Sequence, residues 1–233
     1  MTASPTRRRC LVCEREALSV APACAAHLAD PRSHRDAACA ALRAGALRAP
    51  TFRGVAWPEV DLRGAALEHA NFEEAELRDA RFDGADLARA TLRRASLPRA
   101  TLVGCPLQTA NLEDVDLRGA SLPRARLEGA RLSGADLRGA DLSECTLTGT
   151  ELRRADLRDA SLRGARLLRV SFSGAKMAGL DLRGATLRDC SADGAEGLEA
   201  AFGDDGPPRF DAPGPRPAGP APIRPPKPSE LKW

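Results

Sequence analysis

A large apolar residue recurs at every fifth position along more than half of this chain. The series runs from Phe52 to Leu187 and comprises 28 consecutive quintets without an insertion. A small residue stands two places earlier in most quintets, and it is alanine in 19 of the 28. Typical quintets read ADLRG over residues 135–139 and ADLRD over residues 155–159. Any fold for this chain has to bring these apolar side chains into one core.

A strict period of five fits neither a helix nor a continuous strand. Successive fifth residues rotate by about 140° around an α-helix, and they alternate between the two faces of a strand. All the large residues can share one core only if the chain turns after every quintet. Four turns of about 90° close a square coil whose large and small positions point inward and whose other three positions point outward. The sequence therefore predicts an all-β fold, a stack of coils paired as a parallel β-solenoid.

The repeats ADLRG, ADLRD, ANLED and ANFEE resemble the A(D/N)LXX signature of the pentapeptide-repeat family over about 60% of the chain. This resemblance implies a right-handed quadrilateral β-helix. The 28 quintets amount to about seven coils, and a strand spacing of about 4.8 Å gives a rod of about 34 Å. Glycine ends 13 quintets, for example at Gly119, Gly134 and Gly139. Glycine suits the corners because it tolerates tight turns.

Composition shifts divide the chain into five segments. These are a zinc-binding module (1–35), a capping helix or linker (36–50), the β-helix (51–191), a C-terminal cap (192–202) and a Pro-rich tail (203–233). Residues 36–48 combine an N-cap candidate, Asp36, with strong helix formers, so we expect a helix that closes the first coil. Ten of the 31 residues from Gly203 onward are proline. This composition predicts a disordered tail without a packed core.

Four metal-ligating side chains occur in two closely spaced pairs near the N-terminus. Cys10 and Cys13 form the first pair, and Cys24 and His27 form the second. Such spacing can bring four ligands to a tetrahedral structural Zn²⁺, and the segment resembles small treble-clef-like or zinc-ribbon-like modules. His34 and Cys39 are alternatives to His27. The competing interpretation is a flexible arm in which the cysteines are spaced by coincidence.

The remaining cysteines and the histidines do not suggest catalysis. Cys105, Cys145 and Cys190 fall at the small inward position, where we expect buried, inert thiols. Cys105 and Cys145 lie two coils apart, which is about 9.6 Å by strand spacing and too far for a disulfide. His69 is the only histidine in the repeats. Because no grouping of nucleophile, base and orienting residue is recognisable, we expect no enzyme.

The outward charges fall into columns. Stacking by 20 residues aligns an aspartate column and, two residues over, an arginine column: Asp116, Asp136 and Asp156 beside Arg118, Arg138 and Arg158. Opposite columns offset the repulsion within each column, so we interpret this as a solvated, self-compensating face. Along the axis, Glu59 to Asp86 holds nine acids against three arginines, whereas Leu87 to Cys190 holds 18 basic residues and 12 acids. One end of the rod is therefore predicted to be acidic and the other basic.

Net charge, cysteine pattern and hydropathy indicate where in the cell the protein is expected. The formal net charge is only +3, and no apolar stretch of signal-peptide or transmembrane length occurs. The seven cysteines do not resemble a secreted disulfide framework. We therefore expect a cytoplasmic protein without a membrane partner.

Three functional classes remain. The leading one is a non-catalytic scaffold that binds a protein partner of unknown identity. The family resemblance implies a second: some pentapeptide proteins are acidic DNA mimics that bind a type II topoisomerase such as gyrase and protect it from fluoroquinolones. This chain departs from that pattern, since its repeats hold 22 basic and 21 acidic residues. The third class is nucleic-acid binding through Arg7, Arg8, Arg9, the zinc module and the basic coils, but the repeats offer no aromatic stacking platform.

Overall fold

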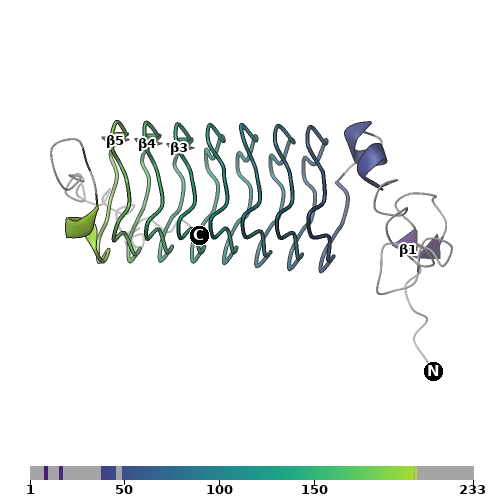
Figure 1. The fold of residues 1–233 in the computed structure, drawn as a ribbon, viewed down its shortest axis with the longest axis horizontal. Coiled ribbons are helices and arrows are strands. Elements are labelled where there is room, and N and C mark those ends of the chain that lie inside the picture. Colours follow the sequence, from purple (N-terminus) through teal and green to yellow (C-terminus); the bar gives the residue numbers. More distant parts are fainter. Residues whose placement is uncertain (1–7, 10–15, 18–37, 46–48, 202, 204–233) are drawn as a thin grey trace, which may run out of the picture.

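The computed structural model describes residues 8–9, 16–17, 38–45, 49–201 and 203. Residues 49–201 form one elongated rod of stacked coils (Figure 1). Bridge partners lie 20 residues apart and pair in parallel, from Thr51 with Asn71 at one end to Lys176 with Glu196 at the other. The parallel β-solenoid predicted from the period of five is confirmed.

Backbone hydrogen bonds join each coil to the next at three positions of a quintet. The amide of Leu117 donates to the carbonyl of Asp136 (2.8 Å), and the amide of Gly119 donates to that of Arg138 (2.9 Å). In the opposite direction, the backbone amide of Asp136 donates to the carbonyl of Val115 (2.9 Å). These bonds satisfy buried backbone groups without any regular helix, which is why so short a repeat can build a continuous structure.

The corners are tight turns that require an unusual backbone conformation. The amide of Ala120 donates to the carbonyl of Leu117 (3.0 Å), and the intervening corner residue, Gly119, has a φ of 62°. The last residue of every quintet from position 54 to position 189 shares this positive φ, including Arg94 at 56° and Thr109 at 55°. Glycine adopts this conformation freely, whereas other residues adopt it at a cost.

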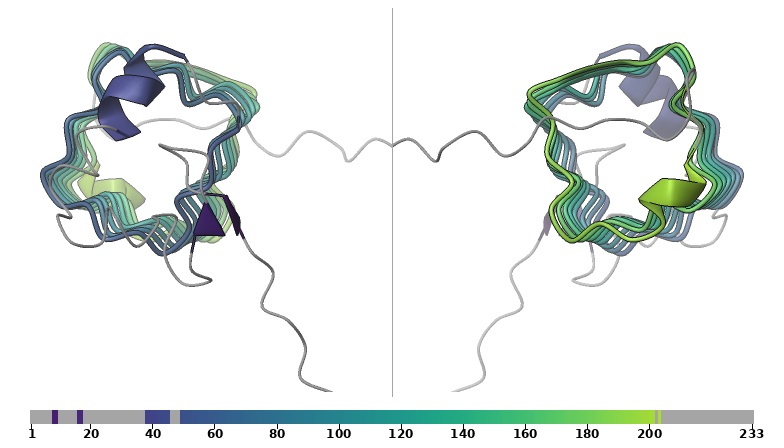
Figure 2. Two further views of the ribbon diagram at one scale, coloured as in Figure 1. Left: turned by 90° about the vertical axis from the view of Figure 1, so that its right-hand side faces the viewer. Right: turned by 90° about the vertical axis from the view of Figure 1, so that its left-hand side faces the viewer.

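The core is a stack of inward-pointing side chains along the axis of the rod. Leu117, Leu137 and Leu157 have no exposed surface, and nearly all of the alanines two positions before the large residues are also buried. Views along the rod show the coils superposed in a four-sided outline (Figure 2). Aromatic rings gather at the N-terminal end, where Phe52 stacks on Phe72 with ring centroids 5.0 Å apart. These few aromatic contacts add to a core made mainly of leucine and alanine.

Four faces result from this stacking, and each is defined by its large inward residues. The first face runs from Phe52 to Phe172, the second from Trp57 to Met177, the third from Leu62 to Leu182 and the fourth from Leu67 to Leu187, each in steps of 20 residues. The fourth face contains the three longest strands of the rod, β3 (Thr146–Thr148), β4 (Arg166–Leu168) and β5 (Thr186–Arg188). They form a parallel sheet in the order β3-β4-β5.

Short helical segments lie at the two ends of the rod (Figure 1). A helix over residues 38–43 buries Leu42 completely, and the Leu42 carbonyl accepts a hydrogen bond from the amide of Ala66 (3.2 Å). At the other end, the 3-10 helix η1 (Leu198–Ala200) follows Gly197, whose φ is 73°. Both segments place apolar side chains against the terminal coils, where an open β-ladder would otherwise expose its edge.

Most of the expected zinc module and nearly all of the Pro-rich tail lie outside the described residues. Within the N-terminal segment, the structure describes β1 (Arg8–Arg9) and β2 (Glu16–Ala17). These two strands pair in an antiparallel arrangement, with Arg8 opposite Ala17 and Arg9 opposite Glu16.

Candidate binding surface

The outward side chains of the second face form a ladder of ion pairs. Arg118 donates from Nε to Oδ1 of Asp116 (2.8 Å) and from Nη2 to Oδ2 (2.7 Å). The pairs Asp136–Arg138 and Asp156–Arg158 repeat this two-bond geometry on the following coils. Each pair joins positions on either side of a large inward residue, so both side chains point outward.

These pairs fix the charge of their members. Hydrogen bonds from the Arg118 side chain lower the pKa of Asp116, and those from Arg158 lower the pKa of Asp156. The hydrogen bond to Asp136 raises the pKa of Arg138. A carboxylate that already binds a guanidinium has little capacity left for an external partner, so the second face is electrostatically self-compensated here.

The acidic N-terminal coils also compensate their charge, through pairs that cross between coils. Glu73 lies 2.9 Å from Arg93 and 3.4 Å from Arg53. Asp79 accepts two hydrogen bonds of 2.7 Å from Arg99. The acidic-to-basic polarity read from the sequence is therefore reduced, because arginines of neighbouring coils neutralise several of the acids.

A row of paired residues follows the first face, at the two outward positions after each large residue. From the second coil onward it reads Glu73–Glu74, Arg93–Arg94, Glu113–Asp114, Ser133–Gly134, Arg153–Arg154 and Ser173–Gly174. The sign of charge alternates through the first three pairs, and Arg93 bonds Glu73 while Arg94 lies 3.9 Å from Asp114. The alternation stops at Ser133–Gly134, where small side chains replace charged ones.

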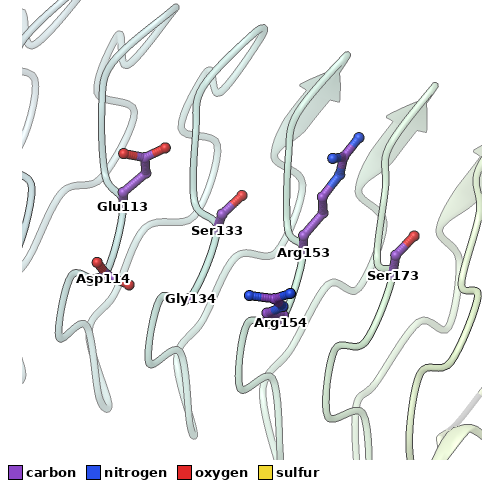
Figure 3. Close-up of a pocket in the computed structure, with 7 residues that line it drawn as sticks. All are labelled: Glu113, Asp114, Ser133, Gly134, Arg153, Arg154 and Ser173. Atoms are coloured by element: carbon purple, nitrogen blue, oxygen red, sulfur yellow. The ribbon is translucent and has the colours of Figure 1, made fainter.

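A shallow depression opens where the alternation stops. It has a volume of about 530 Å³ and is lined by Glu113, Asp114, Ser133, Gly134, Arg153, Arg154 and Ser173. Figure 3 shows the carboxylates and the guanidinium groups on different coils, with the coil of Ser133 and Gly134 between them. The Asp114 carboxylate lies against Gly134, where a Cβ atom would collide with it, so this acid occupies part of the space that the missing side chain leaves. Sequence reasoning did not find this depression, although the interrupted charge alternation was a signal for it.

The inward cysteines are buried as expected from their position. The thiols of Cys105 and Cys145 donate to the carbonyls of Phe82 and Leu122, each at 2.9 Å. Burial raises the pKa of both thiols to about 12, which keeps them protonated and unreactive at neutral pH. Thr150 takes the same position, and its hydroxyl donates to the carbonyl of Leu127 (2.8 Å).

The predicted metal ligands Cys10, Cys13, Cys24 and His27, and the spare ligand His34, lie outside the described residues. Cys39 is described, and it is 5% exposed within the hydrophobic core. In the part of the chain that the structure describes, no three His, Cys, Asp or Glu side chains gather as a metal site. Nor is any described helix long and apolar enough to cross a membrane.

Comparison with known proteins agrees with the repeat and with the architecture. The family model for pentapeptide repeats matches in eight copies, over residues 51–84, 59–94, 75–114, 110–149 and 150–189. The chain therefore belongs to the pentapeptide-repeat family, and its fold is the right-handed β-helix of that family. No curated protein sequence matches it.

Two solved structures of other proteins are similar to this chain at low sequence identity. Full-length QnrB1, a plasmid-mediated fluoroquinolone resistance protein, matches with a TM-score of 0.52 and 18% identity, over 64% of this chain and 89% of QnrB1. HetL, a pentapeptide-repeat protein involved in heterocyst differentiation regulation in the cyanobacterium Nostoc sp. strain PCC 7120, is 26% identical. That match covers 70% of this chain and 95% of HetL, with a TM-score of 0.27.

Proposed function

We propose that this protein is a non-catalytic scaffold whose β-helix binds a protein partner through outward side chains. The observation that carries this proposal is the continuous ladder of inter-coil hydrogen bonds, which runs along the rod while three positions of every quintet stay at its surface. Inward residues maintain the fold and outward residues are free to vary, so a partner can be recognised without loss of the framework. A cytoplasmic location is part of this proposal, because the cysteine pattern does not resemble a secreted disulfide framework.

An affinity-capture experiment tests the scaffold proposal. The full chain would be used as bait beside chains that lack residues 1–35 or residues 204–233, and captured proteins would be identified by mass spectrometry and then titrated as purified proteins. We expect a saturable partner that all three chains retain, because the β-helix is common to them. Loss of the partner with either deletion would place recognition in a terminal segment and contradict the proposal.

The alternative function is protection of a type II topoisomerase by DNA mimicry. It is motivated by family membership and by the description of QnrB1 as a fluoroquinolone resistance protein. A DNA mimic needs unpaired surface carboxylates that imitate phosphates. Here Glu73 and Asp79 already bind arginines of the next coil. This arrangement disfavours DNA mimicry.

A gyrase assay separates the two functions. At micromolar concentration, we expect the protein neither to inhibit gyrase supercoiling nor to rescue it from a quinolone. The matched variant neutralises five acids of the N-terminal coils: Glu73→Gln, Glu74→Gln, Glu76→Gln, Asp79→Asn and Asp83→Asn. Rescue by the natural chain that disappears in this variant would overturn the scaffold proposal in favour of the alternative.

Direct nucleic-acid binding is the third candidate, and the ladder of the second face argues against it. Arg118, Arg138 and Arg158 each bind a carboxylate that a phosphate would have to displace. We expect weak binding of a DNA duplex that falls steeply with salt, because any phosphate contact releases counterions.

We also propose that Cys10, Cys13, Cys24 and His27 hold one structural Zn²⁺. The ligand spacing supports this proposal, and so does the antiparallel pairing of β1 and β2, which flank the segment that contains Cys10 and Cys13. Zinc would cross-link a segment too short for a core of its own.

Metal analysis of the purified chain tests the zinc proposal. We expect about one zinc per chain, loss of zinc in Cys10→Ser, and retention in the control Cys105→Ser, whose thiol is buried in the rod. Chelation should leave the β-helix folded, because its core is independent of the N-terminal segment. A metal-free chain, or unfolding of the rod on chelation, would each contradict one part of this proposal.

A further inference from the structure

The arginines of the first face differ in whether the chain supplies them with a counter-ion. Arg93 lies 2.9 Å from Glu73, and Arg131 lies 2.5 Å from Glu113. Among the described residues, no carboxylate lies within ion-pair distance of Arg153 or Arg154. This pair is flanked by serine and glycine on both neighbouring coils, at the positions that carry acids beside Arg93 and Arg94.

Two adjacent guanidinium groups without a counter-ion attract an anion. The acids across the depression do not cancel this charge, since Glu113 pairs with Arg131 and Asp114 lies 3.9 Å from Arg94. Glu151, two residues before Arg153, forms no ion pair with it within 4 Å. The excess positive charge therefore lies on the Arg153 and Arg154 side of the depression, across the coil of Ser133 and Gly134 from Glu113 and Asp114.

We infer that the depression binds an acidic side chain of a protein partner, with Arg153 and Arg154 as cationic ligands and Ser133 and Ser173 as hydroxyl donors. A carboxylate is the matching group because the chain itself places one beside the corresponding arginine three coils earlier. There, Arg93 donates a hydrogen bond to Glu73, which stands where Ser133 stands relative to Arg153. An arginine fork matches a carboxylate in a two-bond geometry. This inference rests on the proposed scaffold function and assigns one of its contact sites.

A nucleic-acid ligand fits the depression less well than an acidic protein side chain. The phosphates of a duplex follow one another closely, so a duplex that reaches Arg153 would also bring phosphates near Glu113, Asp114 and Glu151. A single carboxylate can bind on the Arg153 and Arg154 side of the depression without also occupying the side that Glu113 and Asp114 line.

The test is a titration of the full chain with the capped dipeptide acetyl-Glu-Glu-amide, followed by amide chemical shifts at low salt. We expect saturable shifts that centre on Ser133, Gly134, Arg153 and Arg154. The variant R153Q/R154Q should weaken binding by about ten-fold or more, because it removes both charge-assisted contacts. Ser133→Glu should also block binding, because it restores the carboxylate that Glu73 provides to Arg93.

The matched control is R53Q/R93Q, which removes two positive charges from the same face at arginines that the chain already pairs with Glu73, outside the depression. It should keep the dipeptide affinity within about two-fold if the site is local rather than a general effect of charge. Equal weakening by both double variants, or absence of saturation in the natural chain, would overturn the inference. So would saturation by inorganic phosphate but not by the dipeptide.

The outcomes separate this inference from the proposed function. If R153Q/R154Q abolishes dipeptide binding and also weakens the binding of a captured partner, the scaffold function and the carboxylate site are both supported. If the dipeptide does not bind while a partner is still captured by the rod, the inference fails and the scaffold function stands.

Discussion

At the scale of the residue, the corners of the β-helix are where side chains conflict most with backbone conformation. Thr109 adopts a φ of 55° although it is β-branched, and its Cγ2 would lie 3.3 Å from a Cβ built at Gly129. A left-handed conformation costs a non-glycine residue about 1 to 2 kcal/mol. Glycine avoids this cost, but it loses more chain entropy on folding, which offsets part of the gain. The corners therefore hold strain that a glycine can remove.

Thr109→Gly should raise the free energy of unfolding by about 0.5 to 1 kcal/mol. The reciprocal change, Gly139→Ala, should lower it by about 1 kcal/mol. Nothing lies within 4 Å of a Cβ at Gly139, so this loss reports conformation rather than collision. Denaturant unfolding measures both changes, and destabilisation by Thr109→Gly would show that the corner is not strained.

The pair Asp181–Arg183 predicts a specific dependence of stability on pH. Hydrogen bonds from the Arg183 side chain lower the pKa of Asp181 from 3.8 to about 2 in the folded chain. The Asp181 side chain is only 15% exposed, but the Arg183 side chain is 50% exposed, so solvent screens part of this interaction. A lowered pKa stabilises the fold fully above about pH 4, and this stabilisation is lost as the pH falls toward 2.

Asp181→Asn should therefore cost about 1 kcal/mol at pH 7 and much less near pH 2, where the natural carboxyl is about half protonated in the folded chain and almost fully protonated in the unfolded chain. The measurement is the free energy of unfolding of both chains between pH 2 and pH 7. A difference that does not change with pH would assign the effect to packing rather than to charge.

At the scale of the element, the helix over residues 38–43 protects the first coil. Leu42 is fully buried, and its carbonyl binds the amide of Ala66. Leu42→Ala should cost about 2 to 5 kcal/mol locally, as for other buried leucines. Hydrogen exchange should then increase first at the amides of Trp57 and Leu62. Ala40→Ser is the control because Ala40 is exposed, and equal protection in both variants would show that the helix does not cap the rod.

The sequence predicted the regular part of the fold well because one rule governs each quintet. The large residue, the small residue and the corner follow from position alone, so Leu137, Ala135 and Gly139 could each be assigned before the structure was considered. The ion pairs could be predicted only between the neighbouring aspartate and arginine columns of the second face. Whether Glu73 binds Arg53, Arg93 or neither depends on rotamers and on coil spacing.

The depression beside Arg153 was harder to predict because it depends on the absence of acidic side chains from the neighbouring coils at these positions. Its signal is the replacement of an acidic pair by Ser133–Gly134, which becomes visible only when the quintets are aligned by face rather than along the chain. The left-handed corners without glycine were also not predicted, because propensity alone disfavours residues such as Arg94 at this position.

At the scale of the whole molecule, the rod separates stability from recognition. Inward residues form one core along the axis, and the inter-coil ladder fixes the spacing of outward side chains. A partner surface can then be built from side chains that contribute little to folding. The proposed function depends on this division, because a scaffold must tolerate change at its surface without loss of its framework.

The most direct test of this division compares Leu137→Ala with Arg138→Ala, two adjacent residues on the same coil. Leu137 is fully buried, whereas the Arg138 side chain is 43% exposed in its ion pair with Asp136. The measured free energy of unfolding should fall by about 2 to 5 kcal/mol for Leu137→Ala and by well under about 1 kcal/mol for Arg138→Ala. Equal losses from the two substitutions would contradict the assignment of inward and outward positions.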